Sequence, residues 1–299
     1  MVEGQPCIAL ASCAPFPPVE DDEGPLREGF EALGYTVVDR AWDAADVDWS
    51  SFDAVILRMT WDYAERLPEF LTWAERTGKV TRLIHDIDIV RWNTDKAYLR
   101  VLSEGDGFSM APTLWLERGT DVDLATLLAG VPWTRGFIKP RVGASARETL
   151  RFDVTADGIA TAQQHVGRLL PDESLILQAY LPSVEHEGEL SAFFVAGALT
   201  HGVRKVPSGN DYRVQEDFGA KDYAHQFEAH EAALATAIVE AAERRLGTRL
   251  VYARVDFIRD ASGQLLLNEL EVVEPCMFFR HGGDAGQRFA DAVHSRLAQ

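Results

Sequence analysis

The chain has 299 residues, 46% of them hydrophobic and 25% charged, a composition typical of a globular protein large enough for two or three compact units. Its net charge of −18 argues against non-specific binding to nucleic acid or to an anionic membrane surface. The three cysteines have spacings that fit neither a zinc site nor a disulfide framework, and no apolar run approaches the ~20 residues that span a bilayer.

These features predict a cytoplasmic protein in a reducing compartment, because the cysteine count is odd and the N-terminal apolar run lacks a basic leader. They predict no nucleic-acid partner and no membrane partner. A homo-oligomer is one state that the sequence allows.

The first 92 residues alternate between strand and helix patterns, typical of a small α/β domain with a largely parallel sheet. Ligands bind in loops after the carboxyl ends of such strands. Arg58 is therefore a candidate for binding a substrate carboxylate, with Trp61 or Tyr63 as a pocket wall. Alternatively, both aromatic residues pack the core and Arg58 pairs with a surface acid. The strands are expected at 8–14, 35–38, 54–57 and 80–85, and the helices at 25–33 and 67–76, the second ending at Gly78.

Two lysines in the middle of the chain are candidates for binding phosphate. Residues 93–96 are expected to open a helix, and a lysine in a first turn, Lys96, is disfavoured by the helix dipole unless it has a partner. Lys139 ends a strand and precedes a loop of small residues that contains Gly143 and Ser145. Such a loop can fold over phosphates through its backbone N–H groups, although it matches neither the P-loop nor the G-x-G-x-x-G pattern. The alternatives are an exposed lysine and a plain hairpin.

Further strands and two helices are expected in the second half of the chain. A strand at 175–182 leads into a polar segment with Glu185 and Glu189, and Arg213 ends a loop suited to phosphate or carboxylate. The final helix is expected to cover a second sheet. The strands are expected at 190–195 and 203–207, and the helices at 227–246 and 284–297.

Residues 250–275 read as a β-hairpin, because two runs of branched and aromatic residues flank a turn at Ser262-Gly263. If that turn has two residues, Asp256 faces Glu269 and Arg254 faces Glu271 across the strands. Side chains alternate along each strand, so these four residues share one face.

Three carboxylates on one half-buried face repel each other unless a cation joins them. With no His or Cys nearby, the oxygen donors suit Mg²⁺ or Mn²⁺, which usually takes further ligands from nucleotide phosphates. The alternative is an edge hairpin with a solvated charged face.

Taken together in chain order, these pieces resemble the ATP-grasp superfamily, and within it the glutathione synthetase-like ligases. The resemblance covers roughly the last two thirds of the chain. It implies an α/β (α+β) ATP-grasp fold with an N-terminal domain at 1–92, a small subdomain at 93–180 and a C-terminal subdomain with the metal site at 181–299. The pieces are Asn93 and Lys96, the strand 137–140, the glycine-containing loop, the segment 178–182, Arg213, the Arg254-Val255-Asp256 segment and the Glu269-Leu270-Glu271 segment.

The resemblance also implies residue roles, with ATP and Mg²⁺ or Mn²⁺ as cofactors. Glu271 stands where the superfamily usually has Asn, so it departs from the pattern. The phosphates of ATP would be bound by Lys96, Lys139 and the loop that contains Gly143 and Ser145. Adenine would meet the hinge formed by Gln178, Ala179, Tyr180 and Leu181, and the ribose would meet Glu189 or Glu185. Asp256, Glu269 and Glu271 would coordinate the metal. The transferred phosphoryl group would be contacted by Arg254, Lys139 and Arg213.

A closer resemblance, to the O-ureidoserine cyclo-ligases of cycloserine biosynthesis, is carried by the stretches 58–63, 181–185 and 268–275. It implies a small amino-acid-derived substrate whose carboxylate is activated as an acyl phosphate and attacked by a nitrogen of the same molecule. An intermolecular carboxylate–amine ligase and an inactive nucleotide-binding module remain as alternatives.

Overall fold

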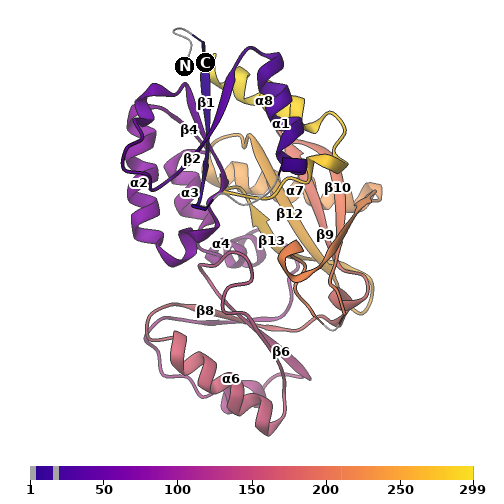
Figure 1. The fold of residues 1–299 in the computed structure, drawn as a ribbon. Helices are drawn as coiled ribbons and strands as arrows, with labels where there is room; N and C mark the ends of the chain where they lie inside the picture. Colours follow the sequence, from indigo (N-terminus) through magenta and orange to yellow (C-terminus); the bar gives the residue numbers. More distant parts are fainter. Residues whose placement is uncertain (1–4, 16–19, 210, 299) are drawn as a thin grey trace.

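The computed structural model describes residues 5–15, 20–209 and 211–298 and contains three sheets. The strands of these sheets fall within residues 7–84, 113–179 and 189–271. Figure 1 shows the sheet of residues 113–179, with α6 beside it, at the far end of the molecule from the two termini. None of the described helices is long and apolar enough to cross a membrane.

The N-terminal sheet is parallel throughout, in the order β2-β1-β3-β4, which confirms the predicted parallel α/β sheet. Helix α2 continues through Gly78, so the predicted stop there is wrong: one glycine costs a helix only about 1 kcal/mol. The strands are β1 (Cys7–Ser12), β2 (Thr36–Ala41), β3 (Ala54–Met59) and β4 (Arg82–Ile84), and the helices are α1 (Glu20–Ala32), α2 (Leu67–Val80) and α3 (Ile87–Asn93).

The helix predicted after residues 93–96 does begin at Ala97, where Asp95 accepts from the backbone N–H of Ala97 at 2.9 Å. Asn93, another residue that could have capped it, ends α3 instead. Its buried side chain donates to the backbone oxygen of Leu270 at 2.7 Å and accepts from the backbone N–H of Val272 at 2.8 Å. A tertiary contact thus uses the amide that the prediction gave to a helix cap. The next helix is α4 (Ala97–Arg100), which continues as a π-helical turn to Gly105.

The middle sheet is antiparallel, in the order β5-β8-β6-β7, and encloses its own apolar core with two helices. Its strands are β5 (Thr113–Leu116), β6 (Arg135–Pro140), β7 (Leu150–Asp153) and β8 (Leu175–Ala179), and its helices are α5 (Leu124–Ala129) and α6 (Ala156–Leu169).

The C-terminal sheet is also antiparallel, in the order β11-β10-β9-β12-β13. As predicted, the last helix packs on this sheet, but it also contacts α1, so one core joins the N-terminal and C-terminal sheets. The strands are β9 (Glu189–Val195), β10 (Ala198–Val206), β11 (Lys221–His225), β12 (Tyr252–Arg259) and β13 (Leu265–Glu271), and the helices are α7 (Ala229–Leu246) and α8 (Ala285–Leu297).

His85 links these two sheets as a buried neutral imidazole. Its Nε2 accepts from the backbone N–H of Val251 at 2.8 Å, so its Nδ1 carries the proton and donates to the oxygen of Val272 at 2.7 Å. Burial lowers the pKa of His85 to about 4 from an ordinary value of 6.5. Because the folded-state pKa lies below the unfolded one, the stability is complete above pH 6.5 and is lost as the pH falls towards 4.

We therefore expect His85 to make folding about 3 kcal/mol less favourable at pH 4 than at pH 7. Urea unfolding of the wild type and of His85→Gln at both pH values separates the contribution of His85 to the free energy of unfolding from that of the other titrating side chains. The stability gap between them should shrink at pH 4, while His230→Gln, at a side chain 76% exposed, should show no such change. A gap of constant size would contradict the neutral, buried His85.

Candidate active site

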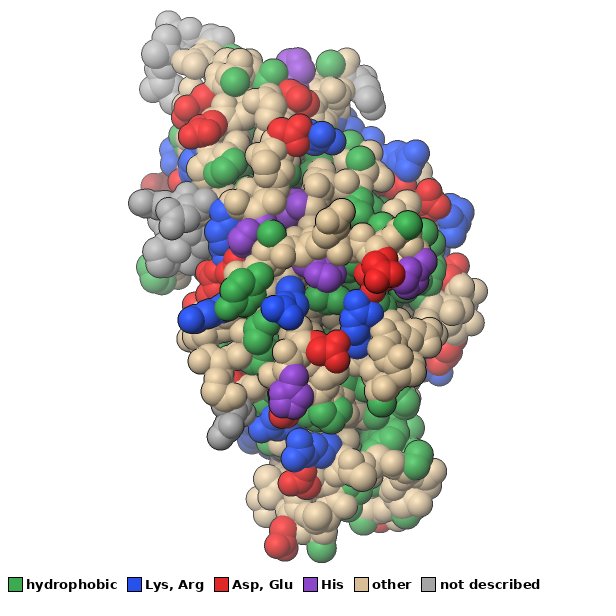
Figure 2. Space-filling view, turned by 90° about the vertical axis from the view of Figure 1, so that its right-hand side faces the viewer, with side chains coloured by type: hydrophobic (Ala, Val, Ile, Leu, Met, Phe, Trp, Pro, Cys, Tyr) green, Lys and Arg blue, Asp and Glu red, His purple; other side chains and the backbone are tan. Residues whose placement is uncertain are grey.

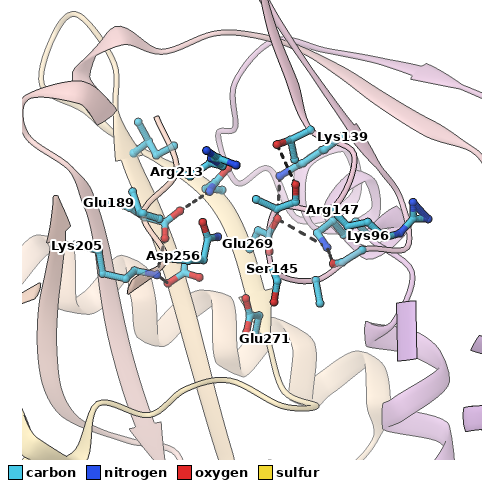
Figure 3. A pocket seen from close by; sticks show the side chains of 18 of the residues that line it. Lys96, Lys139, Ser145, Arg147, Glu189, Lys205, Arg213, Asp256, Glu269 and Glu271 are labelled. Carbon is cyan, nitrogen blue, oxygen red and sulfur yellow. Dashed lines mark hydrogen bonds and ion pairs between the residues drawn. The ribbon is translucent and has the colours of Figure 1, made fainter. Parts of the chain in front are cut away.

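One cavity of about 330 Å³ lies where the three sheets meet. Its lining contains the ends of strands β6 and β8 in the middle sheet, the hinge of residues 178–181, the loop after Lys139 and the carboxylates of the C-terminal hairpin. Figure 3 shows lysine, arginine and carboxylate side chains from different elements pointing toward one another around it. On the outer face shown in Figure 2, by contrast, basic and acidic side chains are interspersed.

The hairpin of β12 and β13 forms the acidic side of the cavity. Arg254 pairs with Glu271, and Asp256 pairs with Glu269, as predicted. The predicted turn is nevertheless wrong: Arg259 already pairs with Leu265, and the side chain of Asp260 organises the loop between them. A bulge between Asp256 and Phe257 then shifts the register by one residue, so the two differences cancel.

Asp256 is the most strongly paired of these carboxylates. Its oxygens accept hydrogen bonds from Arg254 at 2.9 Å and from the Ser191 hydroxyl at 2.5 Å. Burial alone would raise the pKa of Asp256, but Arg254 and Lys205 outweigh it and hold this pKa at about 2. Asp256 is therefore ionised across the working pH range.

Glu271 has the opposite electrostatic balance. Burial and the neighbouring carboxylates Asp256 and Glu269 raise the pKa of Glu271 to about 7, although Arg254 contacts it at 2.6 Å. The face thus carries more negative charge than its arginine neutralises, and an additional cation would stabilise it.

Both predicted phosphate lysines reach the carboxylate of Glu269. Lys139 lies 3.0 Å and Lys96 3.9 Å from its Oε1, and both ammonium groups are buried (Figure 3). Burial would raise the pKa of Glu269, but the two lysines lower it. Lys96 also donates to the backbone oxygen of Gly143 at 2.5 Å, so it links the small-residue loop to the carboxylates.

The donor set suits a hard divalent ion, because it consists of carboxylate oxygens from paired strands. Among the described residues, however, no group of three or more His, Cys, Asp or Glu side chains is placed to hold a metal ion. The reason is visible in the ion pairs: Asp256 and Glu271 face Arg254, and Glu269 faces Lys139. These side chains must turn away from their cations to hold Mg²⁺ together.

Lys205 and Asn268 also belong to this site, although the sequence analysis did not select them. Glu189, from the start of β9, accepts from Lys205 at 2.5 Å and from the Asn268 amide at 2.6 Å. Lys205 also lies 3.5 Å from Asp256. A regular hairpin across Ala196-Gly197 would pair Glu189 with Arg204, but a register shift pairs it with Lys205 instead.

The structure separates the two predicted ribose candidates. Glu189 lines the cavity, whereas Glu185 is not among its lining residues. The carboxylate of Glu185 instead accepts hydrogen bonds from Arg151 and from the Tyr180 hydroxyl, each at 2.7 Å. The Gln178 amide donates to the Thr113 hydroxyl at 3.0 Å, which fixes the hinge. Gln178, Ala179, Tyr180 and Leu181 all line the cavity.

The loop after Lys139 also lines the cavity, through Gly143 and Ser145 among others. Three of its non-glycine residues have positive φ values: Ser145 (49°), Ala146 (55°) and Glu148 (51°). Such backbone geometry is unfavourable for side-chain-bearing residues and is often found at functional loops.

The arginines near the cavity face carboxylates in this structure. Arg147 pairs with Glu173 at 2.5 Å. Arg213 pairs with Asp211 at 2.7 Å, and its guanidinium carbon lies 3.5 Å from the centre of the Phe218 ring. Arg213 therefore lines the cavity without reaching the carboxylates of the hairpin.

The N-terminal candidates divide into two groups. Trp61 and Tyr63 line the cavity. Arg58 is 1% exposed, pairs with the buried Glu23 at 2.5 Å and donates to the backbone oxygen of Pro275 at 3.0 Å. We therefore do not assign Arg58 to the substrate, because its N–H groups hold the N-terminal domain against the segment that follows β13.

Comparisons with known proteins agree with this architecture. Residues 8–85 match the family described as the N-terminal domain of the D-cycloserine synthetase DcsG. The cycloserine biosynthesis protein DcsG of Streptomyces lavendulae is 35% identical over 300 residues, which cover 97% of this chain and 98% of that protein.

Solved structures extend the likeness. The crystal structure of D-cycloserine synthetase DcsG has a TM-score of 0.88 at 33% identity and covers 97% of this chain and 99% of that one. D-alanyl-alanine synthetase A from Vibrio cholerae has a TM-score of 0.70 at 15% identity, with 99% of both chains covered. The predicted ATP-grasp fold is thereby confirmed.

Proposed function

The chain belongs to the family of the cycloserine biosynthesis protein DcsG, and on that premise we propose that it closes a five-membered ring in an amino-acid-derived substrate. It is an ATP-dependent ligase of the ATP-grasp type that acts on a small molecule. The proposed substrate is O-ureido-D-serine and the proposed product is D-cycloserine. The observation that carries the proposal is the convergence of Lys96, Lys139 and Arg254 on Asp256, Glu269 and Glu271 in one cavity.

The lining of the cavity supports one orientation of ATP. Adenine would lie at the hinge of residues 178–181, where backbone groups and Gln178 are fixed. The ribose hydroxyls would bind Glu189, because Glu189 lines the cavity and Glu185 does not. The phosphates would then extend under the loop of Gly143 and Ser145 toward Lys96 and Lys139.

The residues at the phosphate end supply charge stabilisation. Lys139 and Lys96, which now pair with Glu269, would transfer to phosphate oxygens. Glu269, once released, would hold Mg²⁺ together with Asp256 and Glu271. Mg²⁺ or Mn²⁺ bound there would neutralise negative charge on the phosphates. Arg254 would stabilise the phosphoryl group as the substrate carboxylate attacks it.

Hydrolysis by water would remove the carbamoyl group of O-ureido-D-serine as carbon dioxide and ammonia. In the ring-closing step, the nitrogen bonded to the side-chain oxygen attacks the acyl phosphate of the same molecule, loses its proton, forms the C–N bond and releases inorganic phosphate. Holding both ends of one molecule together makes this step effectively unimolecular. The buried lysines and the aromatic walls of the cavity would limit the access of water to the acyl phosphate.

Two other functions are weaker. An intermolecular carboxylate–amine ligase would share every phosphate contact and differ only in the nucleophile. An inactive nucleotide-binding module would not require the intact set of Lys96, Lys139, Arg254, Asp256, Glu269 and Glu271.

The test is a screen for ADP release with ATP, Mg²⁺ and O-ureidoserine of both hands, followed by product mass. We expect ADP release with the D form and a cyclised product without a second amine. ADP release only when an amine is added would favour the intermolecular ligase. Tight ATP binding with no ADP release for any amino-acid-derived carboxylate would overturn the enzyme assignment. The predicted cytoplasmic location and homo-oligomer remain proposals, and sedimentation tests the second.

A further inference from the structure

Glu274 is a buried carboxyl in the cavity that the phosphate and metal contacts leave without a function. It lies three residues beyond Glu271, is 6% exposed and lines the cavity next to Trp61 and Tyr63. This N-terminal-domain side of the cavity does not include the hinge, which comes from the middle sheet. With ATP entering from the hinge, Glu274 lies on the side left for the substrate.

The surroundings of Glu274 leave its charge poorly neutralised. The cations whose charge acts on it are Lys96 and Arg254. Lys96 is shared with Glu269, and Arg254 with Asp256 and Glu271. In the part of the chain that the structure describes, no salt bridge reaches Glu274 itself. A buried carboxylate of this kind is stabilised by a cation that arrives with a ligand.

The backbone around Glu274 is held rigidly. The Trp61 indole N–H donates to the backbone oxygen of Glu274 at 3.4 Å, and Arg58 donates to the oxygen of Pro275 at 3.0 Å. The next residue, Cys276, donates its thiol to Asp22 at 3.3 Å and accepts from Arg254 at 3.2 Å. A carboxyl carried on backbone that is fixed in this way is suited to recognise one ligand group in one place.

The aromatic neighbours complete the recognition site. Burial raises the pKa of the Glu274 carboxyl, and the Tyr63 side chain acts to lower it. Tyr63 is itself fixed by stacking on Phe70, with ring centres 5.3 Å apart. Trp61 is half-buried and presents part of its ring to the cavity. An ammonium group is attracted both by a carboxylate and by an aromatic face.

We propose that Glu274 binds the α-ammonium group of the substrate, with Trp61 and Tyr63 beside it. The inference rests on the proposed function, because it requires an amino-acid substrate whose carboxylate faces the transferred phosphate. The ammonium is bonded to the carbon next to that carboxyl, so it must lie close to Arg254 and Glu271. Glu274 satisfies this requirement, because Arg254 contacts both Glu271, at 2.6 Å, and the backbone oxygen of Cys276, at 3.2 Å, on the two sides of it in the chain.

This contact would also select the hand of the substrate. The carboxylate and the ammonium fix two of the substituents on the α-carbon, and the chain that carries the attacking nitrogen must then point in one direction. The two enantiomers would place this chain against different walls of the cavity, so only one of them would have room to close its ring. Loss of the ammonium anchor should therefore weaken the discrimination between D and L forms.

The experiment compares two changes and their combination, using steady-state ADP release with saturating ATP and Mg²⁺. The first change is Glu274→Gln, and the second is a substrate analogue with hydrogen in place of the amino group. We expect each alone to lower kcat/KM by about 100-fold, and the two together to lower it by little more than either. The preference of Glu274→Gln for the D form should fall by about tenfold or more.

Controls keep the outcomes separate. Glu104→Gln, in an exposed pair with Arg100, should match the wild type throughout. The KM for ATP and the Mg²⁺ requirement of Glu274→Gln should be unchanged, which also shows that it folds, and Glu274→Asp should restore part of the loss. Losses that multiply, or a Mg²⁺ requirement that rises, would overturn the ammonium contact. A wild type that releases no ADP with O-ureido-D-serine would instead overturn the proposed function.

Discussion

Glu269→Gln is expected to lower the rate of ADP release by about 10³-fold or more, the largest catalytic effect that we predict. Glu269 pairs with Asp256 across the hairpin and contacts the lysines assigned to the phosphates. The amide keeps the size of the side chain but removes the charge that would hold Mg²⁺ and orient Lys139. The measurement is single-turnover ADP formation with and without added Mg²⁺.

The matched control is again Glu104→Gln, which removes one carboxylate charge from an exposed helical pair. Circular dichroism should show both variants folded. An activity of Glu269→Gln within a few-fold of the wild type would contradict the placement of the phosphate and metal at this hairpin.

Arg58→Met is expected to lower the free energy of unfolding by about 3–5 kcal/mol, the largest effect on stability that we predict. The change leaves Glu23, with a side chain 3% exposed, as an uncompensated buried charge. It also removes the donor to Pro275, which holds the N-terminal domain against the segment after β13. Urea unfolding at neutral pH measures the loss.

Two further variants identify the cause. Arg91→Met removes an arginine from an exposed pair with Glu75 and should change stability little. Arg58→Met combined with Glu23→Gln should recover part of the loss, because the unpaired charge is gone. Equal losses in the single and double variants would show that packing, and not the buried charge, carries the effect.

The pairing of Asp256 with Glu269 and of Arg254 with Glu271 was predicted from a two-residue turn at Ser262-Gly263, and the pairing is confirmed although that turn is wrong. The pairing of Arg259 with Leu265 next to the loop shifts the register by one residue, and the bulge between Asp256 and Phe257 shifts it back by one residue. Without the bulge, Asp256 would have faced Asn268. Local turn patterns therefore predicted that a hairpin forms, while its register depended on packing that the sequence does not display.

The position of Lys205 also depends on strand register, and here the register shift was not offset by a second one. The strand containing it was predicted, but a regular hairpin pairs Glu189 with Arg204, and a register shift places Lys205 there instead. Its burial beside Asp256 could not be read from the strand pattern.

Contacts between distant segments were the least predictable. Asn93 looks like a helix cap in sequence, yet it binds the backbone of β13 and the residue after it. Arg58 lies after a parallel strand, as a ligand residue would, yet its charge is balanced by Glu23, 35 residues earlier in the chain. By contrast, the ATP-grasp fold was predicted through a family resemblance, which the order of strands, lysines and carboxylates along the chain carries, and it is confirmed.

The central claim is that the enzyme activates its substrate carboxylate by forming an acyl phosphate. The most direct test uses O-ureido-D-serine with both carboxylate oxygens labelled with ¹⁸O, together with ATP and Mg²⁺. Attack of the carboxylate on the γ-phosphate places one labelled oxygen in the bridge, and ring closure then releases it with phosphate. The account predicts inorganic phosphate that carries one ¹⁸O and a cyclic product that retains the other. Unlabelled phosphate, or label in AMP, would contradict it.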